Sequence, residues 1–103
     1  MPYSFRKALE ERKTHSAALR QAEEWRDIKH AWQMATRVVF GKKHNIFRTL
    51  RIVRFSNGTL EVACGHAAEC ASARLQEREL LSALNRILGE TLTVHSLRFH
   101  LEG

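Results

Sequence analysis

Apolar and polar residues alternate on both sides of an Asn57-Gly58 pair, which is typical of a β-hairpin. Asn-Gly suits a type I′ turn, because both central residues of that turn need a positive φ. The alternation predicts one strand over residues 47–55 and a second over 59–64. In the second strand one face is apolar and expected to be buried: Leu60, Val62 and Cys64.

Apolar residues at three- and four-residue steps predict helices before the hairpin. Ser4 and Ser16 suit N-caps, which gives a short helix over 5–12 and a longer one from 16 to about 40, with Gly41 at its C-cap. The longer helix carries one apolar stripe: Ala18, Ala22, Trp25, Ile28, Trp32, Ala35 and Val39. We expect both tryptophans in the core, although exposed ones could stack on nucleic-acid bases.

A further helix is predicted over 67–88, with Ala67, Ala71 and Leu75 on its apolar side and Gly89 at its end. A third strand follows over 91–101, where the alternation changes phase near Ser96. The predicted order is helix, helix, strand, strand, helix, strand. That order is typical of a two-layer α+β sandwich, with helices on a small three-stranded sheet.

The 103 residues fit one domain, with an N-terminal helical extension over 1–15 and a core over 16–101. The formal charge is +6, and it is unevenly distributed. Residues 1–55 hold 13 basic and 5 acidic side chains, whereas residues 56–103 hold 4 and 6. A basic half on a small domain is typical of proteins that bind phosphate-bearing partners.

The candidate phosphate contacts lie in the loop after Gly41, on the first strand and on the third helix. They are Lys42, Lys43, Arg48, Arg51, Arg54, Arg74 and Arg78. The period of a strand puts Arg48 and Arg54 on one face and Arg51 on the other. Neither face of that strand is cleanly apolar, which favours an edge strand whose arginines bind phosphate or discourage aggregation. Arg74 and Arg78 are one helical turn apart and could form a basic rung.

The sequence contains no convincing pattern of catalytic or metal-binding residues. The six histidines lack metal-ligand spacing, and Cys64 and Cys70 form no closely spaced pair. His66 lies between the cysteines, but Cys64 is expected on an apolar face, where a reactive thiolate is disfavoured. Glu77 and Glu79 are expected on the solvent side of their helix. We therefore predict no enzyme activity, no cofactor and no metal.

Nothing in the sequence resembles a signal peptide, and no run of about 18 apolar residues could span a bilayer. Two cysteines in such a chain favour free thiols over a disulfide. These features predict a cytoplasmic protein with no membrane partner.

Several short motifs, in order, resemble the DciA family of bacterial proteins that assist loading of the replicative helicase. They are Trp32, Val38-Val39-Phe40-Gly41, Gly58-Thr59-Leu60-Glu61-Val62, Leu80-Leu81-Ser82-Ala83-Leu84-Asn85, Gly89-Glu90 and Val94. The match covers roughly residues 25–100. Glu69 stands where family members usually have a tryptophan.

The resemblance implies a KH-like fold and a role in DNA replication initiation. It implies single-stranded DNA and the replicative helicase DnaB as partners. Two alternatives stay open: a protein-interaction adaptor that has lost nucleic-acid binding, and a KH-like module that binds RNA.

Overall fold

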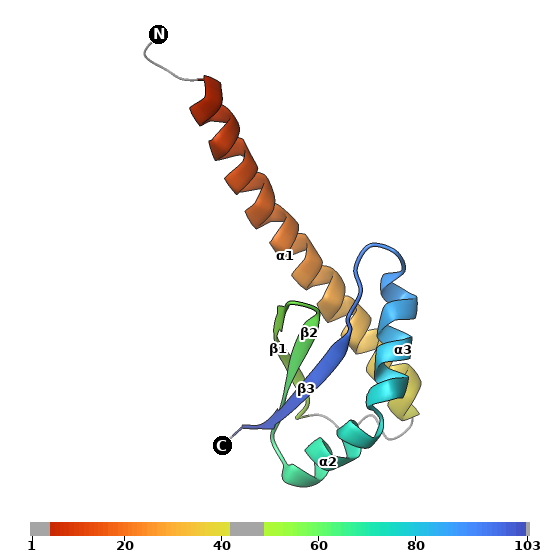
Figure 1. Ribbon diagram of the computed structural model, residues 1–103. Coiled ribbons are helices and arrows are strands. Elements are labelled where there is room, and N and C mark those ends of the chain that lie inside the picture. The colour runs from red at the N-terminus through yellow and green to blue at the C-terminus, as the bar shows by residue number, and fades with distance from the viewer. Residues whose placement is uncertain (1–4, 42–48, 103) are drawn as a thin grey trace.

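The computed structural model describes residues 5–41 and 49–102, with side chains from residue 17 onward. The order of elements is α1 (Phe5–Phe40), β1 (Arg51–Ser56), β2 (Thr59–Cys64), α2 (Ala67–Leu75), α3 (Glu77–Leu88) and β3 (Ser96–Leu101). It is a small α+β domain with a three-stranded mixed sheet, as expected (Figure 1). The predicted order of elements is wrong, because there is one helix before the hairpin and two after it.

The first helix is continuous, so the predicted boundary between residues 12 and 16 is wrong. Its N-terminal part extends away from the rest of the molecule, whose principal extents are 63 × 31 × 20 Å (Figure 1). Ala18 and Ala22 are exposed there, although the apolar stripe included them. From Trp25 onward the stripe is confirmed, since its apolar residues pack in the core. Gly41, with φ of 54°, follows the helix as expected.

The hairpin is confirmed, with Asn57 at φ 51° and Gly58 at φ 78°. Strand β1 is shorter than predicted and lies at one edge, antiparallel to β2. Strand β3 lies at the other edge, parallel to β2. The carbonyl of Gly58 accepts the backbone N–H groups of His95 and Ser96 at 2.8 and 3.2 Å, which fixes the start of β3 beside the turn.

The predicted single helix over 67–88 is broken at Gln76. Two side chains beside the break bind the outer edge of β3: Arg74 Nη2 donates to the Phe99 carbonyl at 3.2 Å, and Glu77 Oε1 accepts the Leu97 N–H at 3.1 Å. Glu77 is therefore not on the solvent side as predicted. The two contacts hold α2 and α3 against the edge of β3 on either side of the break.

The core lies between the helices and one face of the sheet. Helix α2 contributes Cys70 and Ala73 to it, so the predicted apolar side of this helix is wrong: Ala67, Ala71 and Leu75 are exposed. Helix α3 buries one side at the expected spacing and ends at Gly89 as predicted. The largest fully buried side chains are Ile28, Leu60, Leu80, Leu84, Val62, Val94 and Cys64.

The segment before β3 is not a strand, which explains the change of phase near Ser96. Val94 is held instead by Asn85 of α3, whose amide nitrogen donates to the Val94 carbonyl at 2.9 Å. The Asn85 amide oxygen accepts the Val94 N–H at 2.8 Å. Val94 thereby enters the core without a strand partner.

Replacing Asn85 with alanine is expected to lower the free energy of unfolding by about 2–3 kcal/mol, because it leaves two buried backbone groups of Val94 unpaired. Urea denaturation followed by circular dichroism measures the change. Ser82→Ala, at an exposed position on the same helix, is the control and should change stability by less than about 0.5 kcal/mol. An equal effect of the two substitutions would contradict this role of Asn85.

The cysteines form a disulfide between the end of β2 and the first turn of α2, with their Cα atoms 5.5 Å apart. The prediction of free thiols is wrong. The Gly65-His66 turn reverses the chain after β2, which brings Cys70 back beside Cys64. None of the helices in residues 5–41 and 49–102 has the length and apolar character needed to cross a membrane.

Candidate nucleic-acid interface

The face of the sheet opposite the helices carries most of the charge of the strands. We call it the open sheet face, and its central residues are Arg51, Arg54, Glu61, Ala63, Arg98 and His100. The helices cover the other face, because Leu60, Val62, Leu97 and Phe99 point into the core. The open sheet face is therefore defined by the alternation of side chains along β2 and β3.

A β-bulge places Arg51 and Arg54 on this same face. Ile52 pairs with Val62 and Arg54 pairs with Glu61, so Val53 is an extra residue in β1. The extra residue shifts the alternation by one, which brings Arg54 outward together with Arg51. The prediction that these two arginines lie on opposite faces is thus wrong.

The register arranges the charged residues in two rows across the strands. Arg54, Glu61 and Arg98 form one row. Arg51, Ala63 and His100 form the next. Neighbouring strands are about 4.8 Å apart, so the outer members of a row lie roughly 10 Å apart. Three guanidinium groups from two strands therefore share one small surface.

Two of these arginines are paired with carboxylates. Arg54 Nη2 lies 2.9 Å from Glu61 Oε1, and Arg51 pairs with Glu102 across the small side chain of Ala63. The two arginine side chains are 67% and 63% exposed, and ion pairs at such exposed sites contribute little stability, about 0–1 kcal/mol. Arg98 forms no ion pair with any residue in the described part of the chain, and sequence reasoning did not select it. Arg98 lies between Leu97 and Phe99, which were expected on the apolar face of the strand. This alternation was the signal that would have placed Arg98 on the opposite face.

Of the remaining predicted contacts, Arg74 and Arg78 do not join this surface. Lys42, Lys43 and Arg48 lie outside the described residues. Arg74 is on α2 and is bound to the Phe99 carbonyl. Arg78 lies on α3 beyond the break at Gln76, so Arg74 and Arg78 form no common rung.

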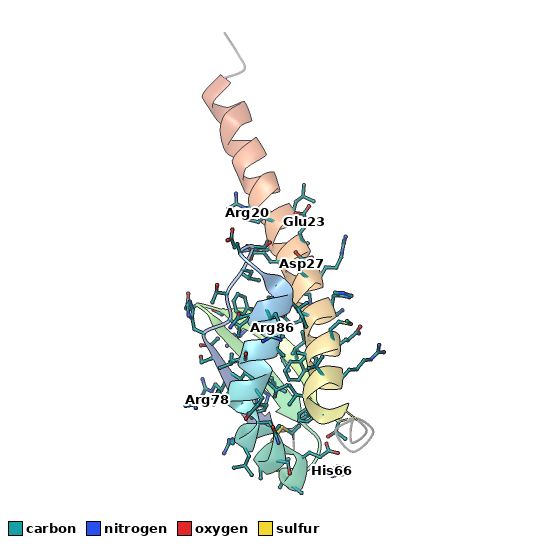
Figure 2. The ribbon with its side chains drawn as sticks, turned by 90° about the vertical axis from the view of Figure 1, so that its right-hand side faces the viewer. Arg20, Glu23, Asp27, His66, Arg78 and Arg86 are labelled. Atoms are coloured by element: carbon teal, nitrogen blue, oxygen red, sulfur yellow. A yellow bond between two sulfur atoms is a disulfide. The ribbon has the colours of Figure 1, made fainter. Side chains whose placement is uncertain are left out.

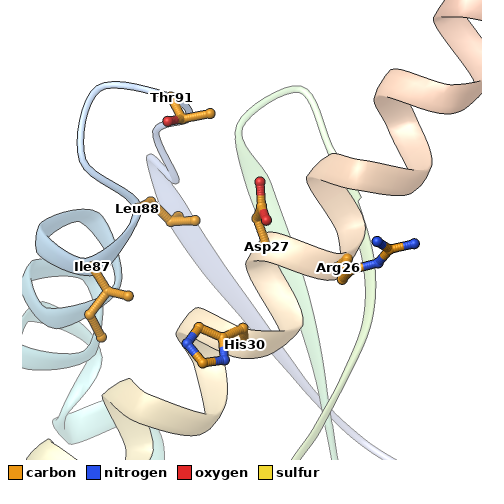
Figure 3. A pocket seen from close by; sticks show the side chains of 6 residues that line it. All are labelled: Arg26, Asp27, His30, Ile87, Leu88 and Thr91. Atoms are coloured by element: carbon orange, nitrogen blue, oxygen red, sulfur yellow. The ribbon is translucent and has the colours of Figure 1, made fainter.

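A second surface lies along the seam between α1 and α3. One hollow of about 540 Å³ is lined by Val38, Val39, Gln76, Arg78, Glu79, Ser82, Ala83 and Arg86. Another of about 490 Å³ is lined by Arg26, Asp27, His30, Ile87, Leu88 and Thr91. Figure 3 shows Asp27 and His30 on the side of α1 that faces Ile87 and Leu88, whereas Arg26 points away. Arg78 and Arg86, which line the first hollow, both belong to α3 (Figure 2).

The described residues contain no group of three or more His, Cys, Asp or Glu side chains that could hold a metal. Both cysteine sulfur atoms are in the disulfide, so neither is available as a thiolate. His66, between the cysteines in sequence, is exposed before α2. The arrangement of the described residues thus offers binding surfaces formed by arginines and apolar side chains.

Comparison with known proteins identifies no family or function for this chain. The chain matches no protein-family model and no curated protein.

Proposed function

We propose that this chain is a non-enzymatic module that binds single-stranded nucleic acid through the open sheet face and contacts a replicative helicase. The resemblance to the DciA family motivates the helicase contact, single-stranded DNA as the preferred ligand and a KH-like arrangement of the fold. The charge of the chain and the position of its arginines support the nucleic-acid contact.

The observation that carries the proposal is the convergence of Arg51, Arg54 and Arg98 on one exposed face. Guanidinium groups bind phosphate oxygens in a bidentate manner, and a spacing of roughly 10 Å across the sheet fits more than one phosphate of a single strand. Binding of this kind is mainly electrostatic and does not depend on sequence.

The ion pairs with Glu61 and Glu102 are compatible with this role. Both arginines and Glu102 are exposed, so a phosphate group can compete with the carboxylates for the guanidinium groups, although the Glu61 side chain is only 20% exposed. In the unbound protein the pairs hold the arginine side chains over the sheet. Binding then exchanges one charged hydrogen bond for another.

The sheet face takes the place of the Gly-x-x-Gly loop with which KH domains clamp nucleotides. The chain has five glycines, at positions 41, 58, 65, 89 and 103, and no two have this spacing. The backbone clamp is therefore absent from the sequence, and side-chain cations must supply the phosphate contacts.

The test is a titration of fluorescent single-stranded DNA at two salt concentrations, followed by anisotropy. Replacing Arg51, Arg54 and Arg98 together with alanine is expected to weaken binding about tenfold or more. It should also reduce the slope of log K against log salt by about one unit for each phosphate group that the variant no longer binds. Parallel titrations with RNA and duplex DNA identify the preferred ligand.

The matched control removes the same charge from the exposed side of α1, with Arg20, Lys29 and Arg37 replaced by alanine. This variant should keep most of the affinity. Equal losses in the two variants would show a general charge effect and contradict a site on the sheet. The absence of any salt-dependent binding at low ionic strength would overturn the proposal.

The ion pairs also favour a second candidate, a protein-interaction adaptor without nucleic-acid binding. In that case Glu61 and Glu102 neutralise Arg54 and Arg51 permanently. The adaptor predicts co-elution with purified replicative helicase that persists after nuclease treatment and in the Arg51/Arg54/Arg98→Ala variant. The nucleic-acid module predicts salt-dependent DNA binding in the absence of any protein partner.

A further inference from the structure

The two hollows lie along the seam where α1 and α3 pack side by side, and we call this seam the α1–α3 groove. Residues 26–30 of α1 face residues 87–91, and residues 38–39 face residues 76–86, so the two helices run in opposite directions. Asp27 and Val38 are eleven residues apart, which corresponds to about 16 Å of helix. The α1–α3 groove is therefore as long as three turns of a docked helix.

The groove has an apolar centre that water reaches. Val38 is 70% exposed, and Met34 lies one turn before it on the same side of α1. Across the seam, α3 contributes Ala83 and the partly exposed Ile87. Exposed apolar side chains contribute nothing to solubility. A row of them along one seam is typical of a surface that contacts another protein.

Arginines flank this apolar centre. Arg78 and Arg86 line the hollow near the C-terminal end of α1, and Arg37 is exposed beside Val38. The carboxylates that line the groove are Asp27 and Glu79. The hollow near the C-terminal end of α1 is thus lined by two arginines and one carboxylate, which is complementary to an acidic partner.

A second copy of this chain does not fit that charge. The part of α1 that extends from the body is the helix most available to another copy (Figure 1). Residues 5–24 hold five basic and four acidic side chains, so this segment has no acidic excess. An acidic helix must come from a different protein.

We propose that the α1–α3 groove binds an amphipathic helix of a partner protein, with apolar residues in the seam and acidic residues against the arginines. Helices that dock into grooves of this kind use apolar anchors at i, i+3 or i+4, and i+7. The open sheet face lies on the opposite layer, so helix binding and nucleic-acid binding use different surfaces. The inference goes beyond the proposed nucleic-acid contact and does not depend on it.

The test is a selection from a displayed library of 16-residue helical peptides against the full chain. The selected peptides are expected to share apolar residues at helical spacing with Asp or Glu beside them. Their synthetic versions should shift the NMR methyl signals of Met34, Val38 and Ile87. Val38→Glu should weaken their binding about tenfold or more, because it places a carboxylate in the apolar centre.

The control is Leu75→Glu, at an 84% exposed apolar position on α2 outside the groove, which should leave peptide binding unchanged. Circular dichroism checks that both variants fold. The Arg51/Arg54/Arg98→Ala variant should still bind peptide, and Val38→Glu should still bind DNA, so the two proposals fail separately. A library without binders, a basic consensus, or binders that tolerate Val38→Glu would overturn the inference.

Discussion

Replacing Trp32 with alanine is expected to lower the free energy of unfolding by about 3–5 kcal/mol, the largest effect of any single substitution considered for this chain. Trp32 is only 6% exposed, and it packs in the same cluster as Ile28 and Leu84. Its removal leaves a cavity in this cluster that movement of the surrounding elements closes only in part. Urea denaturation followed by far-ultraviolet circular dichroism measures the loss without relying on tryptophan fluorescence.

Trp25 is the matched control, because it lies on the same stripe two turns earlier and is only partly buried. Trp25→Ala should cost clearly less than Trp32→Ala. It should also leave the affinity for single-stranded DNA unchanged, since both tryptophans have a packing role. A loss of DNA affinity in Trp25→Ala with stability retained would instead indicate base stacking and contradict this interpretation.

Breaking the Cys64–Cys70 disulfide is expected to lower the free energy of unfolding by about 2 kcal/mol, the value for a short closed loop. The cross-link holds the start of α2 against the end of β2, so its loss should first loosen α2. Adding a reductant to the native protein should reproduce the effect of Cys70→Ser. Amide hydrogen exchange should show faster exchange in α2 than in α3.

The control is the Cys64→Ala, Cys70→Ala double variant, whose stability should not respond to reductant. Mass spectrometry after alkylation without reductant reports the bond directly. Two alkylated cysteines in the native protein, or unchanged stability on reduction, would contradict the cross-link.

The features predicted correctly are those that depend on residues close together in the sequence. The Asn57-Gly58 turn follows from backbone preferences alone, and Gly41 and Gly89 end helices because they adopt positive φ. The Trp25-to-Val39 stripe follows from helical spacing. In each case the residues that decide the structure lie within a few positions of one another.

The elements that were missed depend on distant contacts. Gln76 is a good helix former, so no residue type marks the break, which lies between two side chains that bind β3, Arg74 and Glu77. No residue type marks Val53 as a bulge, so the period of an ideal strand separated Arg51 from Arg54. The sequence therefore indicated two arginines of the candidate site, Arg51 and Arg54, but neither their shared face nor the third, Arg98.

The reach of α1 has one more consequence. The 20 residues from Phe5 to Glu24 precede the first core residues of this helix, and they span about 30 Å at the rise of an α-helix. A ligand held at the tip would be too distant to compete with one held on the sheet.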